Sequence, residues 1–211
     1  MYLIKRDNDL LDTLVFKVRL LSFKQIVTFY WGDSKSSKIS ARKRLNELVS
    51  KKLLHREQSL TYPVFTLTEP LYTWRPGQPW PDYEILSEYL NHRWSQQEIP
   101  VITSVYFASK KAVNCLGGYF NSFDRSRGSH NLNVSQIYLN LWKNNCLSEC
   151  LWIGEANLTE TDEKNNRIPD AILKNKNESD VAVRFASKLS VERLESLHEY
   201  HVKNEMRYQL W

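Results

Sequence analysis

Cysteine is scarce in this chain, and its spacing excludes the common structural zinc sites. The three cysteines are Cys115, Cys146 and Cys150, and the close pair lacks the second pair that a tetrahedral zinc site needs. An odd number of cysteines also leaves at least one thiol without a disulfide partner inside the chain. We therefore expect free thiols in a reducing compartment and a cytoplasmic protein.

Long apolar runs are absent as well. Charged residues interrupt the apolar ones throughout residues 1–12, so this segment has no signal-peptide core, and no stretch is long and apolar enough for a membrane span. We expect a soluble protein with no membrane partner. Its 211 residues, 42% hydrophobic and 25% charged, suit one mixed domain or two small ones, and we favour two.

Acidic residues are few in the N-terminal part of the chain. The first 60 residues contain 13 Lys and Arg against 6 Asp and Glu, whereas the remainder contains 16 against 18. A cationic face of this kind attracts a phosphate backbone. The alternative is a moderately basic, solvated surface with no nucleic-acid role.

Apolar residues recur at helical spacing near the N-terminus, and two strand-like runs follow them. The predicted elements are helices over 10–21, 22–30 and 36–48 and a hairpin of strands 51–56 and 62–68. Three helices followed by a two-stranded ribbon are typical of a winged helix-turn-helix, in which the third helix enters the major groove of DNA. Residues 1–75 are therefore predicted to form a winged-helix domain that binds double-stranded DNA.

The residues expected to contact DNA are cations of the third helix and of the ribbon. They are Lys38, Arg42, Lys43, Arg44, Lys51, Lys52 and Arg56. Winged helices also serve as protein-protein modules, so an adaptor that touches no nucleic acid is the alternative.

A segment rich in Pro, Trp and Gly, residues 72–81, is predicted to be a stiff connector. Trp74 and Trp80 in this connector are candidates for exposed stacking surfaces. Residues 76–128 are expected to hold this connector and accessory elements, including a helix capped by Asp82 and a strand over 101–107.

The last third of the chain, residues 129–211, alternates helix and strand patterns in a characteristic order. The predicted elements are a helix over 133–142, a strand ending at Glu155, strands over 167–173 and 181–185, a helix over 191–203 and a strand over 208–211. This αβββαβ order is that of the PD-(D/E)XK restriction-endonuclease-like core. The expected fold class is α+β, with a winged helix-turn-helix followed by this nuclease-like domain.

Two acids of this region, Glu155 and Asp170, are candidate ligands for Mg²⁺ or Mn²⁺, because such metals bind carboxylate oxygens. A third acid is missing, because Arg184 occupies the neighbouring strand. A unit charge at about 4 Å, with an effective dielectric near 20, contributes roughly 4 kcal/mol, enough to compete with a weakly held metal. Arg184 either pairs bidentately with both acids or points to solvent and contacts a phosphate, unless Glu178 or Asp180 replaces the missing ligand.

Several short strings of this region resemble the replication-relaxation group of mobile-element proteins, which is similar to MobC-type plasmid mobilisation proteins. They are Ser129-His-Asn-Leu-Asn-Val-Ser-Gln-Ile-Tyr-Leu, Trp152-Ile-Gly-Glu, Ile168-Pro-Asp-Ala-Ile-Leu, Val181-Ala-Val and Ser190-Val-Glu-Arg-Leu-Glu-Ser-Leu-His. The resemblance covers nearly the full length of the chain and implies a winged helix joined to a nuclease-like half.

Carried over by position, the resemblance implies catalytic roles for His130, Glu155 and Asp170. The expected third acid falls at Arg184, and the expected lysine falls at Ala186, with Lys188 as the nearest amine. We therefore expect a DNA-binding protein of a mobile element with a degenerate active site and no cofactor. The alternative is a nickase or relaxase that uses Mg²⁺ or Mn²⁺.

The partners implied besides DNA are another mobile-element or replication protein, or a second copy of the chain. Two further histidines, His198 and His201, lie three residues apart on the predicted late helix. They lack a third metal ligand, and we expect them on the surface.

Overall fold

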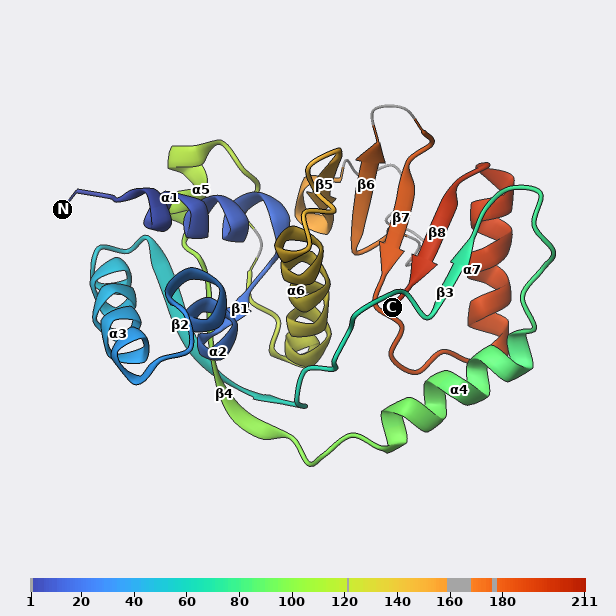
Figure 1. Ribbon diagram of the computed structural model, residues 1–211, viewed down its shortest axis with the longest axis horizontal. Coiled ribbons are helices and arrows are strands. Elements are labelled where there is room, and N and C mark those ends of the chain that lie inside the picture. Colours follow the sequence, from blue (N-terminus) through green and yellow to red (C-terminus); the bar gives the residue numbers. More distant parts are fainter. Residues whose placement is uncertain (1, 121, 159–167, 176–177) are drawn as a thin grey trace.

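The computed structural model describes residues 2–120, 122–158, 168–175 and 178–211. Within these residues the protein combines helices with two sheets (Figure 1), so the expectation of a mixed α and β fold is confirmed. One sheet has the order β1-β4-β2 and the other the order β3-β8-β7-β6-β5. β7 and β8 are parallel, and the other neighbouring strands of both sheets are antiparallel.

Three N-terminal helices form, but the first is displaced from its predicted range of 10–21, because it begins at Lys5 and both Val18 and Leu21 lie beyond its end. They are α1 (Lys5–Asp12), which continues as a π-helical turn over Thr13–Lys17, α2 (Phe23–Ile26), which continues likewise over Val27–Trp31, and α3 (Lys35–Ser50). Ser22, in the short strand β1 (Leu21–Ser22), accepts a hydrogen bond from the Gln25 N–H and so caps α2. Ser34 caps α3 in the same way.

The predicted hairpin between residues 51–56 and 62–68 is wrong. β2 (Leu54–Thr61) pairs along its whole length with β4 (Val101–Ala108), and residues 62–67 lie outside any strand. The reason is that side chains of α6 (Gly128–Lys143) accept hydrogen bonds from backbone donors of this segment. The side chains of Ser129 and Asn133 accept hydrogen bonds from the N–H groups of Tyr62 and Phe65, and Pro63 has no donor at all.

Between β2 and β4 the chain crosses to the larger sheet and returns (Figure 1). β3 (Tyr72–Trp74) pairs with the C-terminal strand β8 (Arg207–Leu210), and α4 (Tyr83–Ser95) packs against α7 (Val191–Lys203). Strand pairing therefore runs across the boundary that the sequence places after residue 75. Trp74 is buried within β3, so the expectation of an exposed stacking surface is wrong for this residue, whereas Trp80 is 61% exposed.

The elements of the C-terminal region follow in the predicted order. After α5 (Lys110–Leu116) and a short 3-10 helix (Arg125–Arg127), they are α6 (Gly128–Lys143), β5 (Cys150–Gly154), β6 (Ala171–Asn175), β7 (Val181–Arg184), α7 and β8. α6 begins five residues earlier than predicted, which places His130 in its first turn rather than before it.

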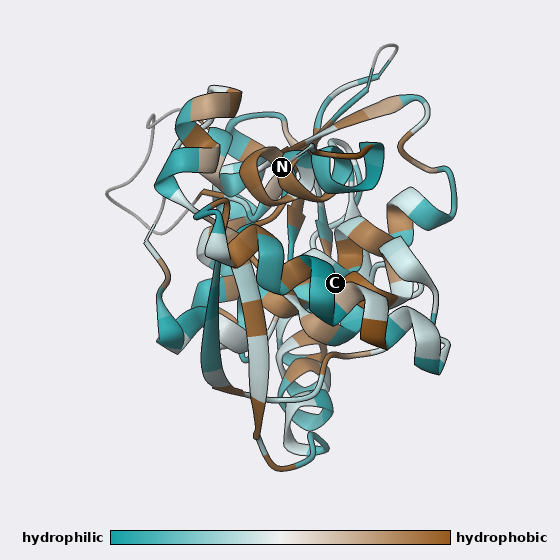
Figure 2. Cartoon of the chain, turned by 90° about the vertical axis from the view of Figure 1, so that its left-hand side faces the viewer, coloured by the Kyte–Doolittle hydropathy of each residue, from teal (hydrophilic) through white to brown (hydrophobic). Residues whose placement is uncertain are grey.

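A single core cluster joins the two sheets. It contains Leu54 and Tyr106 of the smaller sheet, Trp152 and Val183 of the larger one, and Ile137 of α6 between them. In Figure 2, hydrophobic and hydrophilic residues alternate along the helices and strands, as expected when each element buries one face. None of the helices in the described ranges has the length and apolar character of a membrane span.

The expectation that His198 and His201 lie on the surface is wrong. Both side chains are fully buried on the inner face of α7, where His198 Nδ1 lies 3.0 Å from the Tyr208 hydroxyl. The ring of Trp74 packs edge-on against His198 at 4.8 Å. These histidines are buried because α4 and β3, which come from a distant part of the chain, cover α7. The local periodicity of α7 gives no indication of this cover.

Candidate functional site

The strand register brings the two predicted acids to the same end of the larger sheet. Glu155 directly follows β5 and Asp170 directly precedes β6, and these strands pair so that Gly154 lies opposite Ala171. The Glu155 N–H donates to the Asp170 carbonyl at 2.9 Å, and the Asp170 N–H donates to the carbonyl of Val183 at 3.0 Å. The sequence prediction that these two acids belong to one site agrees with this geometry.

The carboxylate of Asp170 is buried and bound on both oxygens. Its side chain is 8% exposed. Oδ1 accepts a hydrogen bond from His130 Nε2 at 2.7 Å, and Oδ2 accepts one from the Phe185 backbone N–H at 2.8 Å. Burial raises the pKa of Asp170, but the contact with His130, the charge of Arg184 and the Phe185 N–H outweigh it and lower the pKa overall. The carboxylate therefore remains ionised.

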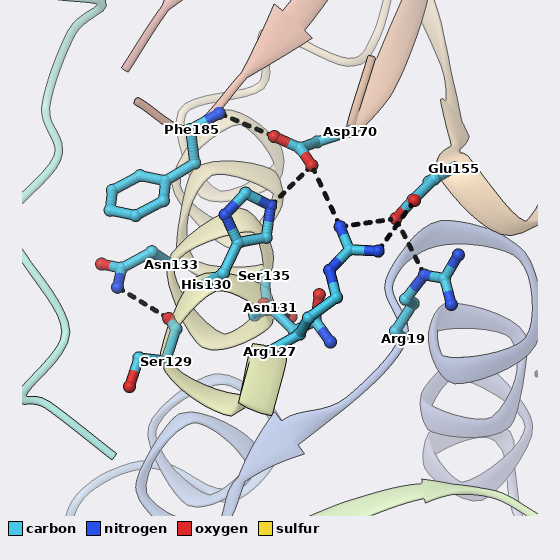
Figure 3. A network of polar contacts seen from close by, with 10 residues as sticks. All are labelled: Arg19, Arg127, Ser129, His130, Asn131, Asn133, Ser135, Glu155, Asp170 and Phe185. Carbon is cyan, nitrogen blue, oxygen red and sulfur yellow. Dashed lines mark hydrogen bonds and ion pairs between the residues drawn. The ribbon is translucent and has the colours of Figure 1, made fainter. Parts of the chain in front are cut away.

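The carboxylate of Glu155 is held by two arginines from opposite sides (Figure 3). Arg19 Nε donates to Oε2 at 2.9 Å, while Arg127 reaches both oxygens, with Nη1 3.1 Å from Oε1 and Nη2 3.4 Å from Oε2. Nη2 of Arg127 also lies 4.0 Å from Asp170 Oδ1. One guanidinium thus bridges the two acids.

Of the two arrangements expected for Arg184, bidentate pairing with both acids is therefore wrong, because Arg127 takes that position. Arg184 ends β7, is half-buried, and has its Nε shielded from solvent. Burial lowers its pKa, while Asp170 and Glu155 act in the opposite direction. It lies close enough to act on both carboxylates, but the described ion pairs of Glu155 are with Arg19 and Arg127.

Sequence reasoning missed both arginines for physical reasons. Arg127 lies three residues before His130, and in a helix this spacing places two side chains on the same face. The sequence therefore contains a signal that Arg127 lies near His130. Arg19 comes from the segment between α1 and β1, 136 residues away from Glu155. No local pattern connects such residues.

The proposed replacements for the missing ligand do not reach the site. Glu178 and Asp180 precede β7, whereas the acids lie beyond its other end, and four extended residues span about 13 Å. Glu178 instead pairs with Arg207. Lys188, the predicted amine, is exposed and forms no ion pair with any described residue.

A cavity of about 210 Å³ opens beside the acids, at the junction of the two sheets. Glu155, Asp170, Arg19 and Arg127 line it together with apolar side chains. The junction is tight, because a side-chain carbon added to Gly154 would lie 2.2 Å from the carbonyl oxygen of Lys17. Only glycine fits there without a backbone shift.

The carboxylate oxygens do not fit a divalent cation in this arrangement. Both acids already accept from guanidinium, imidazole or backbone donors. Within the described ranges, no group of three His, Cys, Asp or Glu side chains is placed to hold a metal ion. The site is a closed network of opposite charges.

The residues predicted to contact DNA mostly lie exposed, with one exception. Those with exposed side chains are Lys38, Arg42, Lys43, Lys51, Lys52 and Arg56. Arg44 is different, because its guanidinium binds the fully buried carboxylate of Asp7 and the carboxylate of Glu47. Its assignment as a DNA contact is therefore wrong, since this side chain already neutralises an interior charge.

The fold and the site define a mixed α and β protein with a cationic helix and a closed carboxylate network. No family model, curated protein or solved structure matches the chain.

Proposed function

We propose that the protein binds double-stranded DNA through α3 and the β2–β4 ribbon, as a winged helix-turn-helix does. The observation that carries this proposal is the exposed face of α3. Its cations are Lys35, Arg42 and Lys43, together with Lys38, which forms an exposed ion pair with Asp33 at 2.8 Å. The single acid of the helix, Glu47, is paired with Arg44. A helix face with cations and no free carboxylate suits a phosphate backbone.

Three helices beside a two-stranded ribbon support the same reading, with the ribbon formed by β2 and the distant strand β4 rather than by a hairpin. In winged helices the third helix enters the major groove and the ribbon touches the backbone. Here Arg56 of β2 donates to Asn46 of α3 at 3.3 Å, so the ribbon and the helix lie side by side. The resemblance to replication-relaxation proteins leads us to propose a mobile genetic element as the setting.

We further propose that the C-terminal half is a nuclease-like domain that does not cleave. Two arginines and a histidine occupy the carboxylates that would hold a metal. In a hydrolytic site these oxygens would have to remain available to the ion. The guanidinium of Arg127, which bridges both acids, is the specific feature that supports this part of the proposal.

Duplex binding is tested by fluorescence anisotropy of a labelled duplex over a range of salt concentrations. Contact with phosphates predicts an affinity that falls steeply as salt rises. Lys43→Ala is expected to reduce the slope of log affinity against log salt by about 1. Binding that is absent or indifferent to salt would refute the proposal and favour a protein-interaction adaptor.

Cleavage is tested separately with supercoiled plasmid in Mg²⁺ or Mn²⁺. We expect no nicking above that of the Asp170→Ala variant. Nicking by the wild-type protein that Asp170→Ala abolishes would identify a metal-dependent nickase and refute the closed-site proposal.

A further inference from the structure

A larger groove, of about 900 Å³, lies on the face of the β2–β4 ribbon. Its walls are α2, one side of α6 and the extended segment Thr61–Thr68, and its floor includes Ile102, Ser104 and Tyr106 of β4. These elements are neighbours in Figure 1. We call this hollow the ribbon groove. It is distinct from the cavity beside Glu155 and Asp170.

All charged side chains among the described residues that line the ribbon groove are positive. They are Lys24 of α2, Arg42 of α3, Arg56 of β2 and Lys143 of α6, and no Asp or Glu of the described chain lines it. Cations on walls of low dielectric concentrate the field within a cleft and attract an anionic ligand. The charge of the groove therefore favours a polyanion.

Aromatic side chains line the same groove as these cations. Phe23, Phe29, Tyr62 and Phe65 line the groove and are each only partly buried. The guanidinium of Arg42 lies over the ring of Phe23, 5.2 Å from its centre. Partly exposed rings beside cations are what proteins use to stack unpaired bases while holding the backbone that joins them.

The size of the groove favours a few unpaired nucleotides over a duplex. Its volume is in the upper part of the range of roughly 300–1,000 Å³ for ligand pockets, which suits a few unpaired nucleotides. A duplex presents its bases inside its own grooves and is bound by elements that protrude from a protein. The exposed face of α3 protrudes, whereas the ribbon groove is hollow and lined with rings.

We propose that the ribbon groove binds single-stranded nucleic acid. The strand would place its phosphates near Lys24, Arg56 and Lys143 and its bases against the rings of Phe23 and Phe29. This inference goes beyond the proposed binding of duplex DNA. Arg42 and Arg56 belong to both surfaces, whereas Lys24 and Lys143 line the groove alone and Lys38 and Lys43 lie on α3 outside it, so variants at these four lysines test the two proposals separately.

The test compares two matched double variants of the full chain in anisotropy titrations. Lys24→Glu with Lys143→Glu changes exposed residues that line the groove, and Lys38→Glu with Lys43→Glu changes exposed residues of α3 that do not. The probes are a labelled oligothymidylate, a labelled oligouridylate and a labelled duplex. Thermal unfolding confirms that both variants fold.

We expect the groove variant to lose roughly tenfold or more in affinity for single strands and to keep its affinity for the duplex. The α3 variant should show the opposite pattern. Comparison of the two oligonucleotides then distinguishes DNA from RNA as the ligand. A Phe29→Leu variant, which removes a ring but no charge, should also weaken single-strand binding.

Single-strand binding that the groove variant leaves unchanged would overturn the inference, as would its absence from the wild-type protein. If the protein bound polyglutamate in a salt-sensitive manner and did not bind the oligonucleotides, the result would overturn the inference in favour of an acidic protein partner. Failure to bind the duplex, with single-strand binding intact, would refute the function proposed for α3 and leave this inference standing.

Discussion

Replacing Arg44 with methionine is expected to destabilise the protein without acting on DNA contacts. Arg44 Nε lies 3.1 Å from Asp7 Oδ1 and Nη2 lies 2.5 Å from Oδ2, and the side chain of Asp7 is 0% exposed. Asp7 also accepts a hydrogen bond from the Ile4 N–H at 2.9 Å. Methionine keeps most of the apolar length of arginine but removes the charge, so the substitution isolates the electrostatic contribution.

The expected loss is about 3–5 kcal/mol in the free energy of unfolding, the usual cost of leaving one partner of a buried ion pair alone. Burial raises the pKa of Asp7, but Arg44 and the Ile4 N–H lower it overall. Without Arg44 the carboxyl can take up a proton, and Arg44 itself is 19% exposed, so we expect the lower end of this range. At roughly 2–4 °C per kcal/mol for a chain of this size, the Tm should fall by about 10 °C.

Urea denaturation and thermal unfolding measure the effect, and Lys43→Met is the matched control. Lys43 is the preceding residue of α3 and is exposed. Its replacement should change stability by less than about 0.5 kcal/mol but weaken duplex binding. Two adjacent cations of one helix should thus show opposite patterns in the two assays.

A second substitution distinguishes the effect of the unpaired buried charge of Asp7 from general misfolding. Adding Asp7→Asn to Arg44→Met removes the buried charge that Arg44 neutralises, so part of the lost stability should return. An Arg44→Met protein as stable as the wild type would refute the buried ion pair. If that protein also lost duplex affinity, Arg44 would be a DNA contact after all.

Three further predictions concern the buried side chain of His201, the close contact at Gly154 and the carboxylate network of Glu155 and Asp170. Burial lowers the pKa of His201 to about 4, against an ordinary value of 6.5. As the pH falls, the unfolded chain therefore takes up a proton on this histidine before the folded protein does. About 3 kcal/mol of stability that is present above pH 6.5 should be lost as the pH falls toward 4. Urea titrations across this range check it, and His201→Gln should flatten the profile. Gly154→Ala should cost about 1–3 kcal/mol, because the added carbon meets the carbonyl of Lys17; a stability equal to the wild type would show that the junction is loose. Arg127→Gln should strengthen Mn²⁺ binding in calorimetry relative to the control Lys188→Gln, and equal binding by both would count against the closed carboxylate network.

Much of the local structure could be predicted from the sequence. Capping residues such as Ser22 and Asp82 do cap α2 and α4, and the bounds of α7 agree with its apolar spacing. These features depend on residues within one or two turns of each other. The juxtaposition of Glu155 and Asp170 was also predictable, because it follows from the order of two adjacent antiparallel strands.

Sequence patterns could not decide which distant segments meet. The partner of β2 is β4, some forty residues onward, and not the nearby run over 62–68. The choice depends on Ser129 and Asn133 of α6, whose side chains occupy the backbone donors of that run. Such competition for hydrogen bonds exists only once the helix and the segment are packed together.

Tertiary structure likewise decided the state of each charge. An arginine that faces solvent and one that neutralises an interior acid are the same residue in a sequence, yet Arg42 is exposed while Arg44 binds Asp7 and Arg127 bridges the two site acids. By itself the sequence determined the order of the elements from α6 to β8 and the charge of the N-terminal face, since both follow from local pattern and composition. Only the packed chain decided which cations remain available to a ligand, because pairing and burial depend on contacts between residues far apart in sequence.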